Sequence, residues 1–294
     1  MKRSENKNKI RERKSILSFI TIPVMAVVTL VCIIPFLYII AMSFSSPAAI
    51  INNRVSLWPV NFNFDAYRSV FSYPNFFRAY GYTLIFTIGG TLISLAMMVL
   101  FAYPLSKEQL KGRKFIMKMV VFSMFFSGGL IPNYLLVSNL HLTGSIWAIL
   151  LPFSINQFCL IILINFFKSI PAEIEEAAII DGLGYFGILT RIVLPLSGPA
   201  LTTVGLYTAV FFWNSWFYPL IYLNSSQYPV MLLLRNIVNG STLAVETGGS
   251  GAQFALSISV KSAVIIVSSL PLIVLYPFLQ KYFVKGMTVG AVKE

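Results

Sequence analysis

The stretch that decides the fold is residues 169–199, which read SIPAEIEEAAIIDGLGYFGILTRIVLPLSGP. Pro171 suits the first turn of a helix, and the acidic residues after it lie near the positive end of the helix dipole. Gly182 and Gly184 predict the end of that helix. A second short helix is expected to follow and to stop at Pro195. The stretch therefore predicts two short helices joined by a glycine turn, which is more structure than a simple connection needs.

The first of these helices carries both small and acidic side chains. Four residues fall on one face at i, i+3, i+4, i+7 spacing: Ile174, Ala177, Ala178 and Asp181. Alanines allow another protein to approach closely, and the acidic side chains offer a charged rim for an Arg or Lys of that protein. The alternative is an amphipathic helix that lies on the membrane surface without a partner. Anionic cytoplasmic lipid would repel so acidic a helix, which favours docking to a protein.

Long apolar runs without charge extend on both sides of this segment. Apolar residues make up 57% of the 294 residues and charged residues 11%, against roughly 45–50% and about 25% in soluble domains. Each run is long enough to cross a bilayer, and the strict alternation of barrel strands is absent. The sequence therefore predicts an all-α membrane protein with six transmembrane helices, at about 18–43, within 79–106, two within 119–167 divided near 139–144, at about 198–223, and from about 257 to 280.

The basic residues set the expected orientation. Most of the 22 Lys and Arg residues fall in the N-terminal segment, the loop of residues 107–118, the loop of residues 168–195 and the C-terminal tail. The others are Arg54, Arg68, Arg78, Arg235 and Lys261. The positive-inside rule then places both termini in the cytoplasm.

This orientation divides the chain into regions. We expect a cytoplasmic N-terminus at 1–15, a permease domain at 16–285 and a cytoplasmic tail at 286–294. Within the domain, residues 168–195 form a cytoplasmic loop, and residues 45–77 and 224–256 form outer loops. The second outer loop holds a short helix candidate at 230–238 and a Gly/Ser/Thr-rich stretch at 239–251.

Several function classes lack the residues they need. No G-x-x-x-x-G-K-[ST] phosphate loop is present, and the single histidine, His141, has no metal cluster or nucleophile around it. We therefore expect no catalytic residue, no metal site and no cofactor on this chain, and no nucleic-acid partner. Cys32 and Cys159 lie in apolar runs as small buried hydrophobes. The spans carry no Asp or Glu, which weakens the interpretation as an ion-coupled secondary transporter.

The loop of residues 168–195 resembles the EAA loop of binding-protein-dependent ABC importer permeases. That pattern is Glu-Ala-Ala, three residues, Gly, nine residues, Ile, one residue, Leu-Pro. It is matched at every spacing by Glu176, Ala177, Ala178, Gly182, Ile192, Leu194 and Pro195. Asp181-Gly182 resembles the carbohydrate-uptake branch, which includes the maltose-type permeases. Residues 126–132 (FSGGLIP) and 281–286 (KYFVKG) look like its polysaccharide/oligosaccharide, LplC-like subgroup.

The resemblance implies a type I ABC importer permease in the cytoplasmic membrane of a bacterium. It implies a second homologous permease, a dimer of cytoplasmic ATPase subunits that hold ATP and Mg, an extracytoplasmic solute-binding protein, membrane lipid and a sugar as partners. The 168–195 loop would seat in the ATPase, with Glu176 meeting a basic group and Gly182 supplying the turn. Its movement would switch the permease between inward- and outward-facing states. The tail would also touch the ATPase, and residues 239–251 would reach the sugar cleft of the binding protein.

A sugar pathway needs aromatic faces and hydrogen-bonding side chains in an otherwise apolar bundle. The candidates are Asn133, Tyr134, Asn156, Gln157, Trp213, Asn214, Trp216 and Tyr218. Trp and Tyr near span ends can instead form interfacial belts, and amides can simply join helices. Two further alternatives for the whole chain are a structural membrane protein without cargo and an exporter; the complete EAA loop disfavours the first, and the lack of a nucleotide-binding segment disfavours the second.

Overall fold

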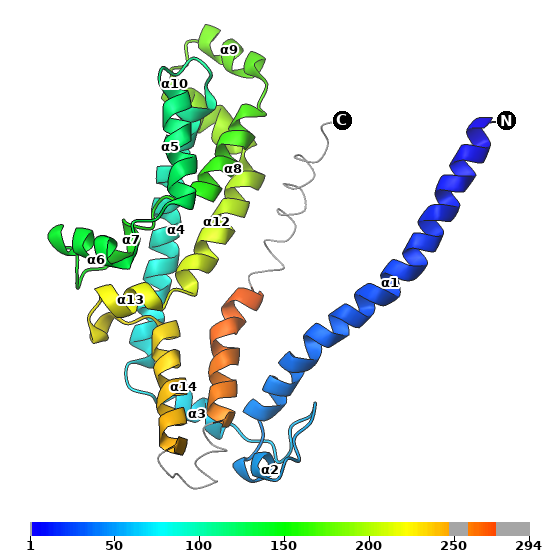
Figure 1. Ribbon diagram of the computed structural model, residues 1–294, viewed down its shortest axis with the longest axis vertical. Coiled ribbons are helices and arrows are strands. Elements are labelled where there is room, and N and C mark those ends of the chain that lie inside the picture. Colours follow the sequence, from blue (N-terminus) through cyan, green and yellow to red (C-terminus); the bar gives the residue numbers. More distant parts are fainter. Residues whose placement is uncertain (1, 247–257, 275–294) are drawn as a thin grey trace. The chain divides into compact units, whose positions relative to one another are not determined.

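The computed structural model describes residues 2–246 and 258–274, and in these two ranges the chain forms helices and connections without a strand. The predicted all-α class is confirmed. The chain divides into two compact units, Met1–Tyr73 with Ile237–Val267 and Pro74–Asn236 with Ser268–Glu294. Figure 1 shows the order of the helices along the chain.

The first unit contains α1 (Lys2–Ser43), α2 (Pro47–Ile51) and α3 (Asp65–Phe71). Thr21–Ser43 of α1 is apolar and almost wholly exposed, as expected for a helix whose solvent is lipid. Beyond α1, the Ser45 hydroxyl donates to the Ala41 carbonyl (2.6 Å) and accepts from the Val60 amide (3.0 Å). The Tyr67 phenol lies 2.9 Å from the Ser43 hydroxyl. Burial raises the pKa of Tyr67 above its ordinary value, and the hydrogen bond to Ser43 offsets part of that rise. These bonds fold the segment after α1 into an ordered cap.

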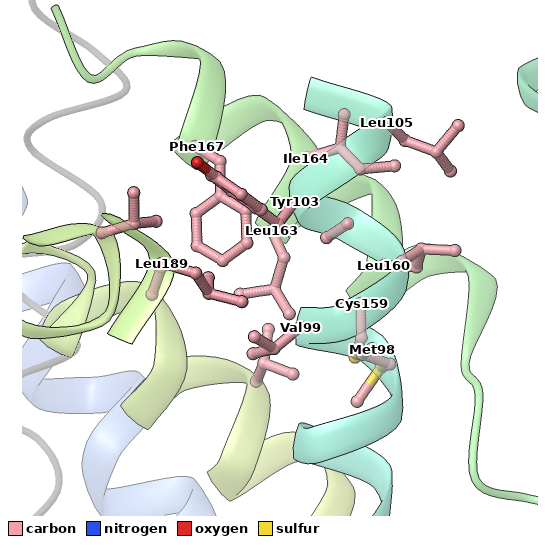
Figure 2. Close-up of a cluster of buried hydrophobic side chains, with 14 of the residues drawn as sticks. Met98, Val99, Tyr103, Leu105, Cys159, Leu160, Leu163, Ile164, Phe167 and Leu189 are labelled. Carbon is pink, nitrogen blue, oxygen red and sulfur yellow. The ribbon is translucent and has the colours of Figure 1, made fainter. Parts of the chain in front are cut away.

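The second unit is built on α4 (Phe76–Ser106), against which α8 (Gln157–Lys168) and α12 (Gly198–Trp213) pack. Figure 2 shows the core where α4 and α8 meet: Met98, Val99, Tyr103 and Leu105 of α4 interleave with Cys159, Leu160, Leu163, Ile164 and Phe167 of α8, beside Leu189. Leu163 and Ile164 are fully buried. This core carries the cytoplasmic-loop segment described below.

A second core lies further toward the start of α4. Phe86 of α4 and Phe212 of α12 are each 1% exposed, and both pack with Ile149 and Tyr222. A Cβ added at Gly90 would lie 2.5 Å from the Phe212 ring, so α12 can approach α4 only because residue 90 has no side chain. The approach of the two helices therefore depends on this glycine.

The remaining helices of the second unit are short. They are α5 (Arg113–Phe125), α6 (Leu130–Asn139), α7 (Trp147–Leu150), α9 (Ala172–Ile180), α10 (Tyr185–Ile188), α11 (Leu194–Leu196) and α13 (Phe217–Tyr222), with a π-helical turn at Leu189–Val193. A 3₁₀ turn, Ser225–Gln227, leads into α14 (Val230–Glu246), and a further helix runs over Ile258–Val274.

Three of the predicted continuous spans are broken. In place of one helix in the first half of 119–167, α5 and α6 meet at 116° around Gly129, whose φ is +88°. The expected helix at 198–223 stops at Trp213 and resumes as α13. The fourth span is reduced to α7 and the 12-residue α8. Apolar composition sets the length of a run, whereas glycine and cap geometry within it set the breaks.

Other boundaries agree with the sequence more closely. α4 covers the run at 79–106, a break is present near 139–144, and the last described helix begins at Ile258. α14 continues through Glu246, beyond the expected end at 238. Residues 247–251 of the Gly/Ser/Thr-rich stretch, 275–280 of the expected sixth span and the 286–294 tail lie outside the described residues.

Within the described ranges, two helices are long and apolar enough to cross a membrane, and up to five crossings result if each bent pair counts as one. The expected number of six therefore remains a prediction, as does the placement of the termini. The membrane character itself is clear from the long apolar helices.

Gly90→Ala is expected to destabilise the second unit, because its methyl group meets the buried Phe212 ring, and overpacking of this kind costs about 1–3 kcal/mol. The matched control is Gly89→Ala, where the nearest outside atom to an added Cβ is 3.9 Å away. Thermal unfolding in detergent, followed by tryptophan fluorescence, compares the two variants. Equal melting temperatures would show that Phe212 moves aside without cost.

Candidate functional site

The central element of the candidate site is α9, which begins directly after Pro171 and ends in a glycine cap. The Gly182 amide donates to the Ile179 carbonyl (3.0 Å) and the Leu183 amide donates to the Ala178 carbonyl (2.9 Å). With a φ of +83° at Gly182, this is a Schellman motif. The two-helix geometry predicted around Gly182 is confirmed, and the cap holds the chain in a sharp turn toward α10.

The second short helix is longer than expected. It runs without interruption from Tyr185 to Leu196, with a π-helical turn at Leu189–Val193, and it meets α12 at 82°. Pro195 lies inside it, so the prediction that the helix stops there was wrong by a residue or two; the break falls at Ser197. The wider π turn just before Pro195 lets the helix continue although proline has no backbone N–H to donate. Ile188, Leu189 and Val193 anchor this helix in the core shared with α4 and α8.

An ion pair joins α9 to the end of α4. The Lys107 ammonium donates to both carboxylate oxygens of Glu175, and it lies 4.7 Å from the centroid of the Tyr103 ring. The two charged side chains are only 24% and 14% exposed. Coulomb attraction is screened less at such burial than on an open surface. The pair therefore fixes the position of α9 against α4, a role that the sequence did not reveal.

A cleft of about 860 Å³ lies beside this ion pair. Its wall is formed by the end of α4 and the following turn, by the α8–α9 connection and by α9 itself. Its charged members are Lys107, Glu108, Lys168, Glu175 and Glu176. Both signs of charge are present, so the cleft can receive a polar side chain of a partner. It is open rather than enclosed by the fold.

The outer surface of this segment combines acidic and large apolar side chains. Ile180 is 86% exposed, Tyr185 74% and Phe186 71%. The acidic members of the same exposed surface are Glu173, Glu176 and Asp181. Ala177 is exposed, whereas Ala178 is buried in the core, so only one of the two alanines faces outward. Ile192 and Leu194 are half-buried and Pro195 is exposed. A polar rim around exposed aromatic and aliphatic side chains is the composition of a docking surface.

Three of the eight pathway candidates have structural roles. Asn156 caps α8, its Oδ1 accepting the Cys159 amide at 3.0 Å. Trp213 is buried, and its indole N–H donates to the Ser268 carbonyl at 3.0 Å. Asn214 ends α12, and its Nδ2 donates to the Val210 carbonyl at 3.0 Å. Gln157 is half-buried at the first position of α8.

The structure brings three other candidates together around a residue that the sequence did not single out. The rings of Tyr134 and Tyr218 each lie nearly parallel to that of Tyr222, at centroid distances of 6.1 Å and 6.4 Å. Asn133 and Tyr222 line a cavity of about 340 Å³ that is otherwise mainly aliphatic. Because the aromatic rings come from α6 and α13, this group forms only once the broken spans fold.

The eighth candidate, Trp216, contacts an arginine. The guanidinium carbon of Arg235 lies 3.6 Å from the centroid of the Trp216 ring. Trp216 sits in the break between α12 and α13, and Arg235 is exposed on α14. The sequence feature that could have pointed to this contact is the lone basic residue, Arg235, in the apolar run at 230–238.

In the described part of the chain, no group of His, Cys, Asp and Glu residues could hold a metal ion. The expectation of no metal and no cofactor on this chain stays a prediction. His141 lies in a turn after α6 with a φ of +55°. The coupling-loop assignment of Glu176 and its neighbours likewise remains a prediction, now with a surface to support it.

Comparison with known proteins places this geometry in context. No protein-family model matches the chain. It is 44% identical to protein LplC of Bacillus subtilis (strain 168) over 266 residues, which cover 90% of each chain. It is 42% identical over 268 residues to the polygalacturonan/rhamnogalacturonan transport system permease protein YtcP of the same organism, covering 90% of this chain and 93% of that protein.

A solved structure agrees with the fold over nearly the whole length. The match is to a chain of a bacterial ABC transporter involved in the import of the acidic polysaccharide alginate. Its TM-score is 0.81 at 32% identity, and it covers 92% of this chain and 97% of that chain. The broken helices and the bent 168–195 segment therefore occur within a fold already seen by crystallography.

Replacing Lys107 by Met is expected to free α9 from α4, because Glu175 loses the charge that it contacts. Amide hydrogen exchange of residues 172–180 should then become about tenfold faster or more, a local-stability change of about 1.4 kcal/mol or above. Lys111→Met, an exposed lysine of the same loop, serves as the control. Exchange rates that stay equal in the two variants would show that apolar packing alone holds α9.

Proposed function

This chain belongs to the permease proteins of ABC transport systems, and from that premise we propose that it is the membrane-spanning subunit of a bacterial importer for an oligosaccharide derived from a polysaccharide. Its relatives are transport components rather than enzymes, and this chain has the same role. The relatives named for their cargo carry polygalacturonan/rhamnogalacturonan and alginate. The apolar helices support placement in a membrane. The distribution of Lys and Arg supports the cytoplasmic side for both termini, which six spans would allow.

The observation that carries the proposal is the exposed surface of the 168–195 segment. It presents Glu176 and Asp181 next to Ile180, Tyr185 and Phe186 on two short helices that the core holds at an angle to the spans. Such a surface would be costly to leave in water, since its apolar side chains gain about 25 cal/mol for each Å² that a partner covers. A cytoplasmic ATPase is the partner that the family supplies.

In this arrangement, α9 acts as the coupling helix. The ATPase dimer, holding ATP and Mg, would close on ATP and displace α9. Glu176 would form the ion pair across the interface, and Gly182 would keep α9 and α10 at a fixed angle. Because α9 is tied to α4 through Glu175 and Lys107, its displacement would be passed to the main helix of the bundle. The permease would thereby change between its inward- and outward-facing states.

The remaining partners follow from the same proposal. A second homologous permease would complete the membrane path, and an extracytoplasmic solute-binding protein would deliver the sugar to the outer loops at 45–77 and 224–256. The Tyr134, Tyr218 and Tyr222 rings offer faces on which pyranose rings can stack, and the Asn133 amide can bond sugar hydroxyls. Lipid would cover the exposed apolar face of α1.

The first test is co-purification in mild detergent with a tag on the N-terminus, followed by mass spectrometry. We expect an ATPase with a phosphate loop and a second permease to accompany this chain. The complex, reconstituted with its binding protein, should take up oligosaccharide only when ATP is supplied. Recovery of this chain alone, under conditions that preserve a known importer, would count against the proposal.

Glu176→Lys should leave the protein inserted in the membrane but uncouple ATP hydrolysis from transport. Reversing the charge at a docked ion pair removes the attraction and adds repulsion, with a loss of about 2–5 kcal/mol. Uptake should fall by at least tenfold, measured beside ATPase activity in proteoliposomes. Glu12→Lys makes the same charge change in the N-terminal segment, outside the 168–195 loop and the cleft beside it, and should retain uptake. Normal uptake by the Glu176 variant would remove this residue from the coupling role.

A further inference from the structure

The contact between Arg235 and Trp216 has no place in the coupling machinery. The guanidinium lies flat enough on the indole for its carbon to approach the ring centroid to 3.6 Å. The indole is half-buried and meets the Phe217 ring edge-on at 5.5 Å, while the arginine is exposed. A cation over a Trp face gains roughly 0.5–1 kcal/mol at an exposed site. That gain alone does not explain why an arginine stands in an apolar run.

A stacked guanidinium keeps its hydrogen-bonding edge available. The aromatic ring covers the face of the planar group, whereas its N–H donors point outward in the plane. Among the described residues, Arg235 forms no ion pair with a carboxylate. Arginine stays charged at every physiological pH. The guanidinium of Arg235 is therefore available to bind an external anion through two parallel N–H···O hydrogen bonds.

The surroundings of this pair are rigid. The Val230 amide at the start of α14 donates to the buried Thr83 hydroxyl of α4 at 2.8 Å. Val230, Leu232 and Leu234 are buried, so α14 presents Arg235 from a fixed face. On the other side, the Gly144 amide holds the Tyr222 carbonyl at 2.7 Å and fastens the end of α13. A binding group placed on packed helices keeps its geometry better than one on a loop.

The position of the charge also argues for a function. Arg235 belongs to the few basic residues that the positive-inside rule does not place in the cytoplasm. Within the outer segments at 45–77 and 224–256, the basic residues Arg54, Arg68 and Arg235 outnumber the acids Asp65 and Glu246. An excess of positive charge in these segments attracts anions and repels cations, which raises the encounter rate of an acidic cargo.

We propose that Arg235, stacked on Trp216, is a carboxylate-binding site that selects acidic, uronate-containing oligosaccharides as they enter the permease. The guanidinium fork binds the carboxylate of a sugar acid, and Trp216 keeps the fork in place and lends an apolar edge to the sugar ring. The site deepens the proposed function and rests on it, since it names the class of oligosaccharide carried. It adds a specificity residue that lies outside the EAA loop.

The same guanidinium could bind a lipid phosphate at the membrane surface, because arginines near helix ends reach toward headgroups. A lipid contact would stabilise the protein without distinguishing one sugar from another. The two sources of anion are therefore separable by comparing an acidic sugar with its neutral counterpart.

The experiment uses the complex of the permeases and ATPase in nanodiscs without the binding protein, so that the selectivity of the binding protein does not enter. Equilibrium binding is measured for a galacturonate pentasaccharide and for the same pentasaccharide with its carboxyl groups reduced to alcohols. The variants are Arg235→Gln, Arg235→Lys and Trp216→Leu, with Arg78→Gln as the control that removes an exposed outer arginine without a tryptophan partner. Nanodiscs of zwitterionic lipid and of partly anionic lipid are compared. ATP-dependent uptake is measured in parallel in proteoliposomes, with the binding protein present.

We expect the wild-type complex to bind the acidic sugar at least about tenfold more tightly than the reduced one, as a charge-assisted two-point contact allows. Arg235→Gln should erase this preference and leave the affinity for the neutral sugar unchanged, while Arg78→Gln keeps it. Arg235→Lys should keep only part of it, because the ammonium lacks the planar fork. Trp216→Leu should reduce it as well.

Equal binding of both sugars by the wild type, binding of neither, or an equal loss of both in Arg235→Gln would overturn the inference. A change that appears only as lower stability in anionic nanodiscs would assign Arg235 to lipid phosphate instead. Either result, with ATP-driven uptake intact, would leave the proposed function standing. Loss of uptake in the wild type would instead refute the proposed function.

Discussion

The packing of α8 and α12 on α4 is the constraint from which the rest of the second unit follows. Gly90 lets the Phe212 ring reach the α4 backbone, and Leu163 and Ile164 fill the other contact completely. Helices in lipid gain little from hydrophobic burial against one another, so close fit supplies much of their association. With this three-helix core in place, the short broken segments have a fixed surface on which to fold. The bent 168–195 segment is one of them, anchored by Ile188 and Val193.

The sequence predicted best where the determinants were local. Pro171, the acids of the first turn and Gly182 act within one or two helical turns, and they specified α9 and its Schellman cap correctly. The all-α class followed from composition, and the family followed from the complete spacing of the EAA pattern. Arg235 and Lys107 could not be assigned in this way, because their partners, Trp216 and Glu175, are distant in sequence and meet them only once the chain folds.

The breaks in the spans were missed for a related reason. Hydropathy measures how much apolar chain is available, and the runs that contain Gly128-Gly129 and Asn214-Ser215 carry no charged residue to mark a break. Backbone geometry decides there: Gly129 adopts a φ of +88° and α12 ends at Asn214. The candidate pathway shows the same limit. Asn156 and Trp213 looked like sugar contacts from composition, yet one caps a helix and the other bonds the backbone. Polar groups inside an apolar bundle mostly form hydrogen bonds within the protein, and only those without such a bond are available to a ligand.

α4 connects the two proposed sites physically. At one end Lys107 holds α9, the proposed coupling helix, and toward the other end Thr83 holds the first residue of α14, which carries Arg235. At the rise of an α-helix the two attachments stand about 36 Å apart, close to the full thickness of a bilayer. A single helix packed on both sides moves as a unit over that distance, because bending it would open the cores around Leu163 and Phe212. A displacement of α9 by an ATPase would therefore shift the base of α14 as well, and with it the carboxylate-binding arginine. Under the proposed function, sugar release and ATP binding would be coupled in this way, without a separate relay of side chains.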